Sequence, residues 1–337
     1  MQTKRQYEQP GNGTWLLSPD GAMRVARVET LQAVQRALLG WYRAHRRALP
    51  WRNSKSPYRI FLSEMMLQQT QVERVIPKYH AFLAEYPTIR RLAAAPLADV
   101  IRLWAGLGYN RRAVHLHRAA QAVVREHGGT FPLHLQELLR LPGIGAYTAR
   151  ALLSFVNNAP VAVVDTNVRR VLGRVFRDEL QALFAEKGPT ERQVQALADG
   201  LVPDGRSARW NQALMDLGST VCTARQPDCP RCPLFTWCQA RRAEQVTDLP
   251  ALRPKGQGKF SGSRRYYRGR IIAALRDSPQ SGALSFEALV SYVETQADGD
   301  VPVAWLWELV QDLERDGLVV SAGDGNSRSG ATVRLPS

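Results

Sequence analysis

Hydrophobic residues recur at three- and four-residue spacing through most of the chain, the pattern of helices that bury one face. This spacing occurs at Leu31, Val34, Leu38, Tyr42, Val100, Leu103 and Leu107. Extended alternating runs are nearly absent between residues 29 and 242. Prolines between the helical patterns are expected to mark helix starts or stops, at Pro57, Pro77, Pro87, Pro96, Pro132 and Pro142. The pattern therefore predicts an all-α body.

Composition divides the chain into four segments. Residues 1–28 are polar and rich in turn formers, which predicts a flexible N-terminal arm, and residues 29–245 hold the helical body. Residues 246–262 combine proline, glycine and basic residues, a composition typical of a linker. Residues 263–337 show three helical patterns and then an extended pair around a Gly-Asp-Gly-Asn hairpin turn. That order predicts a small α+β winged-helix-like domain.

Charge favours a polyanionic partner. The chain carries 45 Lys and Arg against 30 Asp and Glu, a formal net charge of +15, and such an excess binds nucleic acid through counterion release. A generally basic soluble surface is the alternative. No stretch of 18 uncharged apolar residues occurs, and no apolar run follows the charged N-terminal residues. We therefore expect no membrane span, no secretory signal and a cytoplasmic, nucleoid-associated protein.

All four cysteines lie in one 17-residue window with the pattern C-x6-C-x2-C-x5-C, at Cys222, Cys229, Cys232 and Cys238. In a reducing compartment thiols serve as metal ligands rather than as disulfides, and four sulfurs suit a 4Fe-4S cluster or a structural zinc. Zinc usually takes two short C-x2-C pairs, whereas only one is present here. The spacing favours the cluster, with zinc, a disulfide and cysteines without a bonding role left open.

The segment LPGIGAYTARALLSFV predicts a helix ending at Leu141, a Pro-Gly-Ile-Gly turn and a helix beginning at Tyr147. The backbone amides of Gly143 and Gly145 would then lie at a helix N-terminus, where the helix dipole favours a phosphate. Only glycine lets the backbone approach a phosphate so closely. The segment therefore predicts a helix-hairpin-helix, with a tight turn between packed helices as the alternative.

An apolar run ends at Asp165, and a basic helix follows it. Asp165 can simply cap that helix. Held at the helix N-terminus, its carboxylate would also stay ionised, as stabilisation of a developing cation requires. Both interpretations stay open on these residues alone.

Together, LPGIGAYTA, VVDTN and the cysteine window resemble the endonuclease III superfamily, the helix-hairpin-helix DNA glycosylases with an iron-sulfur cluster. Within it, ALPWR (48–52), SEMMLQQTQV (63–72) and GLGYNRRA (106–113) are similar to MutY-type adenine-DNA glycosylases. The resemblance runs from about Leu31 to Arg242, roughly two thirds of the chain. It implies an all-α, two-lobed core with the active site in the cleft between the lobes, a 4Fe-4S cluster on the cysteines, and duplex DNA with a mispaired or damaged base as substrate.

The resemblance assigns catalytic roles to three residues. Glu64 matches the catalytic acid, because a purine leaves more readily once it is protonated. Asp165 matches the aspartate that stabilises or captures the oxocarbenium sugar. Tyr147 stands where lyase members carry lysine, so no Schiff base can form and strand cleavage should be absent. An ordinary core aromatic is the alternative for Tyr147.

The same resemblance implies a DNA-contacting set. Because the target nucleotide must leave the base stack, Gln69 and Tyr109 are implied to fill the gap, with Thr70 beside the opposite base. The other implied DNA-contacting residues are Trp51 and Arg52 at the edge of the adenine pocket, Gly143, Gly145 and Asn167.

Two departures from the family pattern bear on specificity. The winged-helix candidate stands where MutY-type enzymes usually carry a Nudix-like domain, and Asn110 stands where a second tyrosine is common.

The favoured function is a monofunctional glycosylase that removes adenine opposite 8-oxoguanine or G. Thymine or uracil removal from G mispairs is the second enzyme interpretation, and an iron-sulfur DNA-binding regulator is the non-enzyme one. We expect a monomer, with a protein partner bound through the C-terminal domain.

Overall fold

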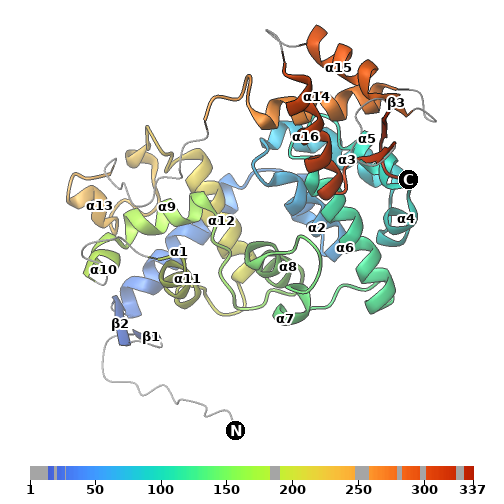
Figure 1. Cartoon of the computed structure of the whole chain (residues 1–337). Helices are drawn as coiled ribbons and strands as arrows, with labels where there is room; N and C mark the ends of the chain where they lie inside the picture. Colours follow the sequence, from blue (N-terminus) through green and yellow to red (C-terminus); the bar gives the residue numbers. More distant parts are fainter. Residues whose placement is uncertain are drawn as a thin grey trace. The chain divides into compact units, whose positions relative to one another are not determined.

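The structure of this protein is a computed structural model (Figure 1). It describes residues 14–18, 21–26, 28–182, 190–246, 258–278, 283–296, 301–323 and 330–337. These residues form two compact units. The first unit holds the described residues up to Lys55 and from Ala149 to Val246, and the second holds Ser56–Thr148 and the described residues from Gly258 onward.

The first unit contains an N-terminal pair of strands followed by helices. Strands β1 (Thr14–Ser18) and β2 (Gly21–Ala26) pair antiparallel. The helices are α1 (Val28–His45), α9 (Thr166–Val175), α10 (Arg177–Ala182), α11 (Glu191–Gly200), α12 (Ser207–Thr220) and α13 (Gln239–Arg242), with the short 3-10 helices η1 (Pro50–Asn53) and η2 (Cys229–Arg231). The two strands lie within the segment for which composition predicts an arm, and the hydrophobic pattern does not predict them.

The core of the first unit includes α1, α9 and α12. Val34 and Leu38 of α1 are buried together with Val171 of α9 and with Trp210 and Leu217 of α12. Full burial of one such aliphatic side chain contributes about 1.5–3 kcal/mol. This packing fixes the places of the predicted site residues that α9 and the segment after α12 carry.

In the second unit, helix α6 (Arg111–His127) is the packing centre of residues 56–148. The other helices of this segment are α2 (Pro57–Leu67), α3 (Val72–Glu85), α4 (Ile89–Ala94), α5 (Leu97–Leu103), α7 (Leu135–Leu138) and the first turn of α8 (Ala146–Asn157). Helix α6 packs against α2, α4 and α5 and buries Val114, Leu116 and Val123. Gly128 follows the last residue of α6 as its C-cap, and its left-handed backbone (φ 59°) suits glycine.

Five of the six prolines lie at helix starts or between helices, as predicted. The prediction is wrong for Pro77, which lies inside α3. A proline within a helix forfeits one backbone hydrogen bond. Burial of Val75, Tyr79 and Phe82 on the same helix offsets that loss.

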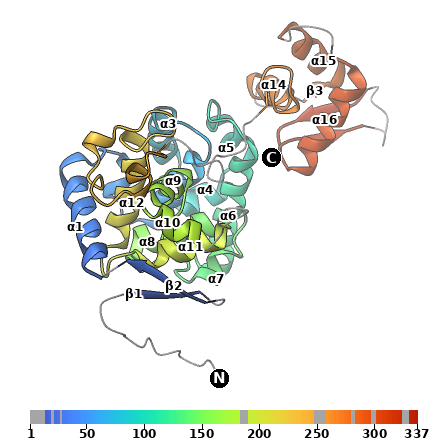
Figure 2. The same cartoon turned by 90° about the vertical axis from the view of Figure 1, so that its left-hand side faces the viewer.

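The C-terminal part of the second unit is a small α+β assembly (Figure 2). Its elements are α14 (Arg264–Asp277), β3 (Leu284–Ser285), α15 (Phe286–Thr295), α16 (Val303–Arg315), β4 (Val320–Ala322) and β5 (Thr332–Arg334). Strand β5 pairs antiparallel with both β3 and β4. Three helices followed by an extended pair were predicted here, and β3 is additional. The predicted Gly-Asp-Gly-Asn turn lies mostly outside the described residues.

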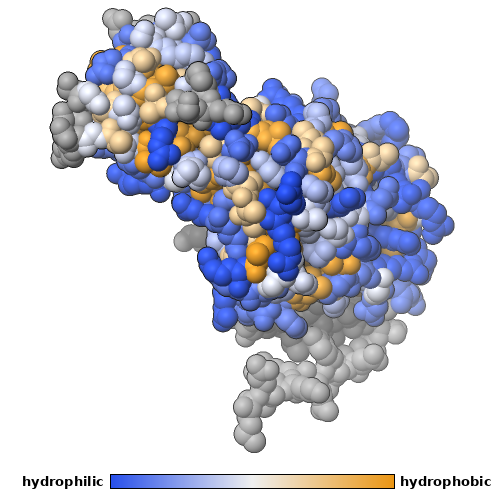
Figure 3. Space-filling view, turned by 90° about the vertical axis from the view of Figure 1, so that its right-hand side faces the viewer, coloured by the Kyte–Doolittle hydropathy of each residue, from blue (hydrophilic) through white to orange (hydrophobic). Residues whose placement is uncertain are grey.

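The face drawn in Figure 3 is largely hydrophilic, with hydrophobic residues in small groups.

Among the described residues, no helix is long and apolar enough to cross a bilayer. Large hydrophobic side chains that are exposed include Tyr109 (44%) and Phe235 (38%). Tyr109 lies in a predicted DNA-contacting segment, and Phe235 lies in the cysteine window.

Candidate functional site

Two turns of the second unit carry the residues predicted to enter the duplex. Gln69 lies between α2 and α3, and Tyr109 lies between α5 and α6. Both have a left-handed backbone, with φ 56° at Gln69 and 45° at Tyr109. This conformation strains a residue with a side chain, and such strain clusters at ligand-contacting sites. Both side chains are exposed, so the predicted residues lie on strained, accessible turns.

One buried arginine joins these two turns. The guanidinium of Arg112 donates hydrogen bonds to the backbone oxygens of Met65 (2.9 Å), Met66 (2.8 Å), Gln68 (2.6 Å), Leu107 (3.0 Å) and Gly108 (3.0 Å). It also donates to Thr70 Oγ1 at 2.9 Å, and the Thr70 hydroxyl donates to the Leu107 oxygen at 3.0 Å. The sequence does not predict this role of Arg112, because an arginine beside Arg111 gives no sign of being buried.

Glu64 lies on α2 among buried neighbours. The helix begins at Pro57, and the Ser56 hydroxyl accepts a hydrogen bond from the Arg59 amide. Glu64 is 6% exposed, and the adjacent Ser63 and Met65 are buried as well. A carboxyl group withdrawn from water in this way is suited to exchange a proton with a bound base rather than with solvent.

The predicted hairpin is present in the second unit, in the turn between α7 and α8. Gly143 has φ 72°, and a Cβ at this position would lie 2.5 Å from the Cβ of His115. The turn therefore requires glycine. A Cβ at Gly145 would meet nothing within 4 Å, which leaves room for a ligand to approach.

The helices flanking the hairpin begin and end close to the predicted positions. Helix α7 ends at Leu138 rather than at Leu141, and α8 begins at Ala146 rather than at Tyr147. Tyr147 is half-buried in the first turn of α8. It is therefore not a fully enclosed core aromatic.

Asp165 caps helix α9 in the first unit, which confirms the capping interpretation. One carboxylate oxygen accepts from the Val168 amide at 2.6 Å, and the other accepts from Asn167 Nδ2 at 3.1 Å. Burial raises the pKa of Asp165 above its ordinary value, and these hydrogen bonds together with the charge of Arg170 offset only part of that rise. A poorly solvated carboxylate stabilises a developing cation more strongly than a solvated one.

Hydrogen bonds lead from Asp165 to the cysteine window. Oδ1 of Asn167 accepts from Nη2 of Arg170 at 2.8 Å. Arg170 donates in turn to the backbone oxygens of Cys222 (2.9 Å) and Gly218 (2.6 Å). Both ends of the Asn167 amide are thus engaged. Asn167, which the resemblance implies to bind DNA, orients the Asp165 carboxylate in this structure.

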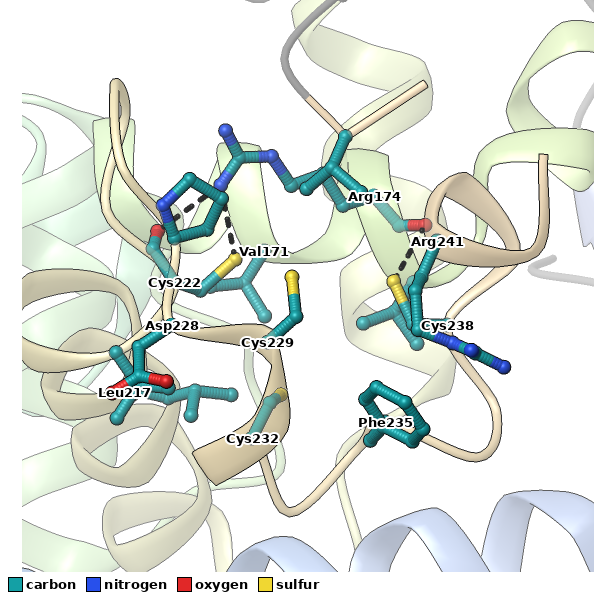
Figure 4. A pocket seen from close by; sticks show the side chains of 14 residues that line it. Val171, Arg174, Leu217, Cys222, Asp228, Cys229, Cys232, Phe235, Cys238 and Arg241 are labelled. Carbon is teal, nitrogen blue, oxygen red and sulfur yellow. Dashed lines mark hydrogen bonds between the residues drawn. The ribbon is translucent and has the colours of Figure 1, made fainter. Parts of the chain in front are cut away.

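The four cysteines line one pocket of the first unit (Figure 4). Arg174 is 3% exposed and donates from Nη1 to Cys222 Sγ at 3.2 Å. The sulfur of Cys238 lies 3.5 Å from the Arg174 backbone oxygen. One buried arginine therefore contacts two of the predicted ligands.

Apolar side chains complete the wall of the cysteine pocket, among them Val171, Leu217 and Phe235. Burial raises the pKa of Cys232 to about 12, so formation of its thiolate needs a compensating positive charge. Within the described residues, no three His, Cys, Asp or Glu side chains are grouped as ligands of a single metal ion.

Trp51 and Arg52 lie on η1 in the first unit. Trp51 is 6% exposed. Arg52 donates from Nη2 to Oδ1 of the fully buried Asp216 at 2.7 Å, and Arg47 Nε donates to the same oxygen at 2.6 Å. Although burial acts to raise it, the two arginines hold the pKa of Asp216 below its ordinary value. This ion pair fixes Arg52, and sequence reasoning did not predict it.

Comparison with known proteins establishes the family. Residues 62–203 match the HhH-GPD superfamily of base excision DNA repair proteins. The chain is 40% identical over 295 residues to a protein named adenine DNA glycosylase from Mycolicibacterium smegmatis, covering 86% of this chain and 93% of that one. This chain belongs to the HhH-GPD superfamily, in its MutY-type branch. A Homo sapiens protein of the same name is 40% identical over 247 residues, which cover 70% of this chain and 43% of the human one.

Solved structures of this superfamily share the fold. A thermostable thymine-DNA glycosylase aligns with a TM-score of 0.59 and 27% identity, covering 64% of this chain and 98% of that one. An endonuclease III bound to DNA aligns with a TM-score of 0.53 and 21% identity, covering 64% and 97%. The resemblance stated on the sequence motifs, and the helical glycosylase fold that it implies, are therefore confirmed.

Proposed function

We propose that this protein is a monofunctional DNA glycosylase that hydrolyses the N-glycosidic bond of adenine mispaired with 8-oxoguanine or G. The observation that carries the proposal is the 40% identity, over 86% of the chain, to a protein named adenine DNA glycosylase. Two further features support it. Glu64 is buried on α2, and Asp165 is poorly solvated at the start of α9.

In the proposed reaction, Gln69 and Tyr109 fill the gap left by the extruded adenine. Glu64 donates a proton to the departing purine, and Asp165 stabilises the oxocarbenium sugar. Water then attacks the anomeric carbon and returns a proton to the Glu64 carboxylate, which restores the enzyme. Trp51, beside Arg52, forms an edge of the base pocket.

Single-turnover assays on duplexes carrying A, T, U or hypoxanthine, each opposite G and 8-oxoguanine, test this function. Release of adenine is expected, with strand scission only after alkali. Preferential release of thymine or uracil would favour the second candidate, which the likeness to the solved thymine-DNA glycosylase supports. No base release from any duplex would favour the DNA-binding regulator.

Tyr147→Lys is expected to confer strand nicking, because it supplies an amine for a Schiff base with the anomeric carbon. Borohydride should trap the covalent adduct on a denaturing gel. Tyr147→Met, which has no amine, is the control and should yield no adduct. If Tyr147→Lys released base without any trapped adduct, Tyr147 would not lie beside the sugar.

We propose that the four cysteines hold a 4Fe-4S cluster. The donor set fits, because four thiols line one pocket with apolar walls and the Arg174 guanidinium donates to the Cys222 sulfur, which stabilises a thiolate. Bound there, the cluster would supply iron-thiolate bonds that cross-link the segment after α12. Zinc is the alternative metal that the same four thiols can bind.

Purified protein is therefore expected to be brown, with broad visible absorbance and equal amounts of iron and acid-labile sulfide. Cys232→Ser should lose the colour and unfold at lower temperature, since metal binding contributes to folding. A colourless wild-type preparation with one zinc per chain would overturn the assignment.

For the C-terminal part we propose a winged-helix-like domain that supplies affinity or a partner contact rather than base choice. The order of α14, β3, α15, α16, β4 and β5 supports the winged-helix-like assignment. Arg264 and Arg268 of α14 form ion pairs with Asp312 and Asp316, so fewer charges of α14 are available to DNA than the sequence indicates. A monomer located at the nucleoid agrees with the excess of basic residues.

A further inference from the structure

We propose that Arg112 is a positioning residue that holds the Gln69 and Tyr109 turns together as one preformed unit, so that base extrusion begins from a fixed geometry. This inference rests on the proposed glycosylase function. It extends that function by assigning a specific step, extrusion, to a residue outside the reacting groups.

The first support is where the hydrogen bonds of Arg112 go. Helix α2 ends at Leu67, and the last carbonyls of a helix have no partner within it. Nη1 of Arg112 donates hydrogen bonds to three carbonyl oxygens at this end of α2. Nη2 donates to two carbonyl oxygens in the turn before Tyr109. A cation at a helix C-terminus is also favoured by the helix dipole. Since Arg112 itself lies on α6, one side chain connects three segments.

The second support is the cost of burying this charge. Arg112 is 7% exposed, and among the described residues it forms no ion pair with a carboxylate. Burial lowers its pKa to about 10. The rings of Trp104 and Tyr109 lie 5.2 and 5.7 Å from the guanidinium carbon and compensate in part. Burying a charge without a counterion is costly, so hydrogen bonds must supply most of the compensation.

The third support is the strain in the two turns. Gln69 and Tyr109 both have positive φ, a conformation that persists only when the surroundings over-determine it. Arg112 bonds to the residue before each of them, Gln68 and Gly108. Without the guanidinium, the hydrogen bond from the Thr70 hydroxyl to the Leu107 oxygen would be left to join the two turns, and each turn could relax more freely.

The test compares Arg112→Ala and Arg112→Lys with the unaltered full-length chain on two duplexes. One has adenine opposite G, where a pair must be broken. The other has adenine opposite an abasic site, where the adenine starts unpaired. Arg112→Ala is expected to slow single-turnover release from the A:G duplex on the order of 100-fold, as misplaced groups do, and to slow release opposite the abasic site much less. Arg112→Lys keeps the charge but has fewer donors, so it should recover part of the loss.

Fluorescence of 2-aminopurine at the target position reports extrusion directly. This signal should be highest for the unaltered chain, lower for Arg112→Lys and lowest for Arg112→Ala. Arg125→Ala is the matched control, because it removes an exposed arginine from the same helix, and it should change neither readout. If Arg112→Ala slowed adenine release equally from both duplexes, Arg112 would have a general structural role and the proposal would be overturned. If Arg112→Ala fails to fold, the proposal is tested with Arg112→Lys, by comparing how much this variant slows release from the A:G duplex and from the duplex with the abasic site. Failure of the wild-type chain to release any base would refute the proposed function, whereas the 2-aminopurine comparison would still test the role of Arg112.

Discussion

Asp165→Asn is expected to lower the single-turnover rate of base release by at least about 10³-fold while duplex affinity stays nearly unchanged. The sugar carries positive charge only near the transition state, so a neutral side chain loses stabilisation there and not in the bound ground state. Asparagine is also a good helix N-cap. The Val168 amide therefore keeps an acceptor, and α9 should remain folded.

Asp178→Asn is the matched control, because Asp178 is an exposed aspartate of the same unit. It should retain the wild-type rate. Circular dichroism and duplex binding should not distinguish the two variants from the wild type. If Asp165→Asn kept more than about a tenth of the wild-type rate, its carboxylate would supply little of the electrostatic stabilisation. Asp165 would then be a helix cap alone, the alternative that its sequence context left open.

The helical body was predictable because residues such as Val34 and Leu38 repeat at the period of a helix, and that period reports which face is buried. A strand of two residues carries no such signal. β3 has two residues, too few for an alternation to be recognised. Pro77 shows the opposite failure, since a residue that locally disfavours helix is retained where packing of its neighbours outweighs the lost hydrogen bond.

The motif positions were predictable because backbone geometry limits the residue types that fit, as it does for glycine at Gly143. The contacts that support the site could not be predicted from the sequence. Arg112 donates mostly to backbone oxygens, and every residue type provides such an oxygen, so the sequence does not indicate its partners. Arg52 pairs with an aspartate 164 residues away, and spacing along the chain does not indicate so distant a contact.

Glu64→Gln is expected to slow purine release by about 10²–10⁴-fold, the usual contribution of a general acid. Glutamine keeps the shape of the side chain and can still form hydrogen bonds, but it has no proton to give. Duplex affinity and the 2-aminopurine signal should persist, because extrusion precedes protonation. Glu85→Gln, which changes an exposed glutamate of the same unit, is the control and should be fully active.

The pH dependence separates the two carboxylates. As pH falls, solvent protonates the purine in place of Glu64, so the residual rate of Glu64→Gln should rise from neutral toward acidic pH. Asp165→Asn should show no such recovery, because its defect is the missing negative charge and not a missing proton. A Glu64→Gln variant as active as the wild type would exclude protonation by Glu64 as the route to base release. The thymine or uracil interpretation would then gain, since a pyrimidine can depart as a stabilised anion that no side chain needs to protonate.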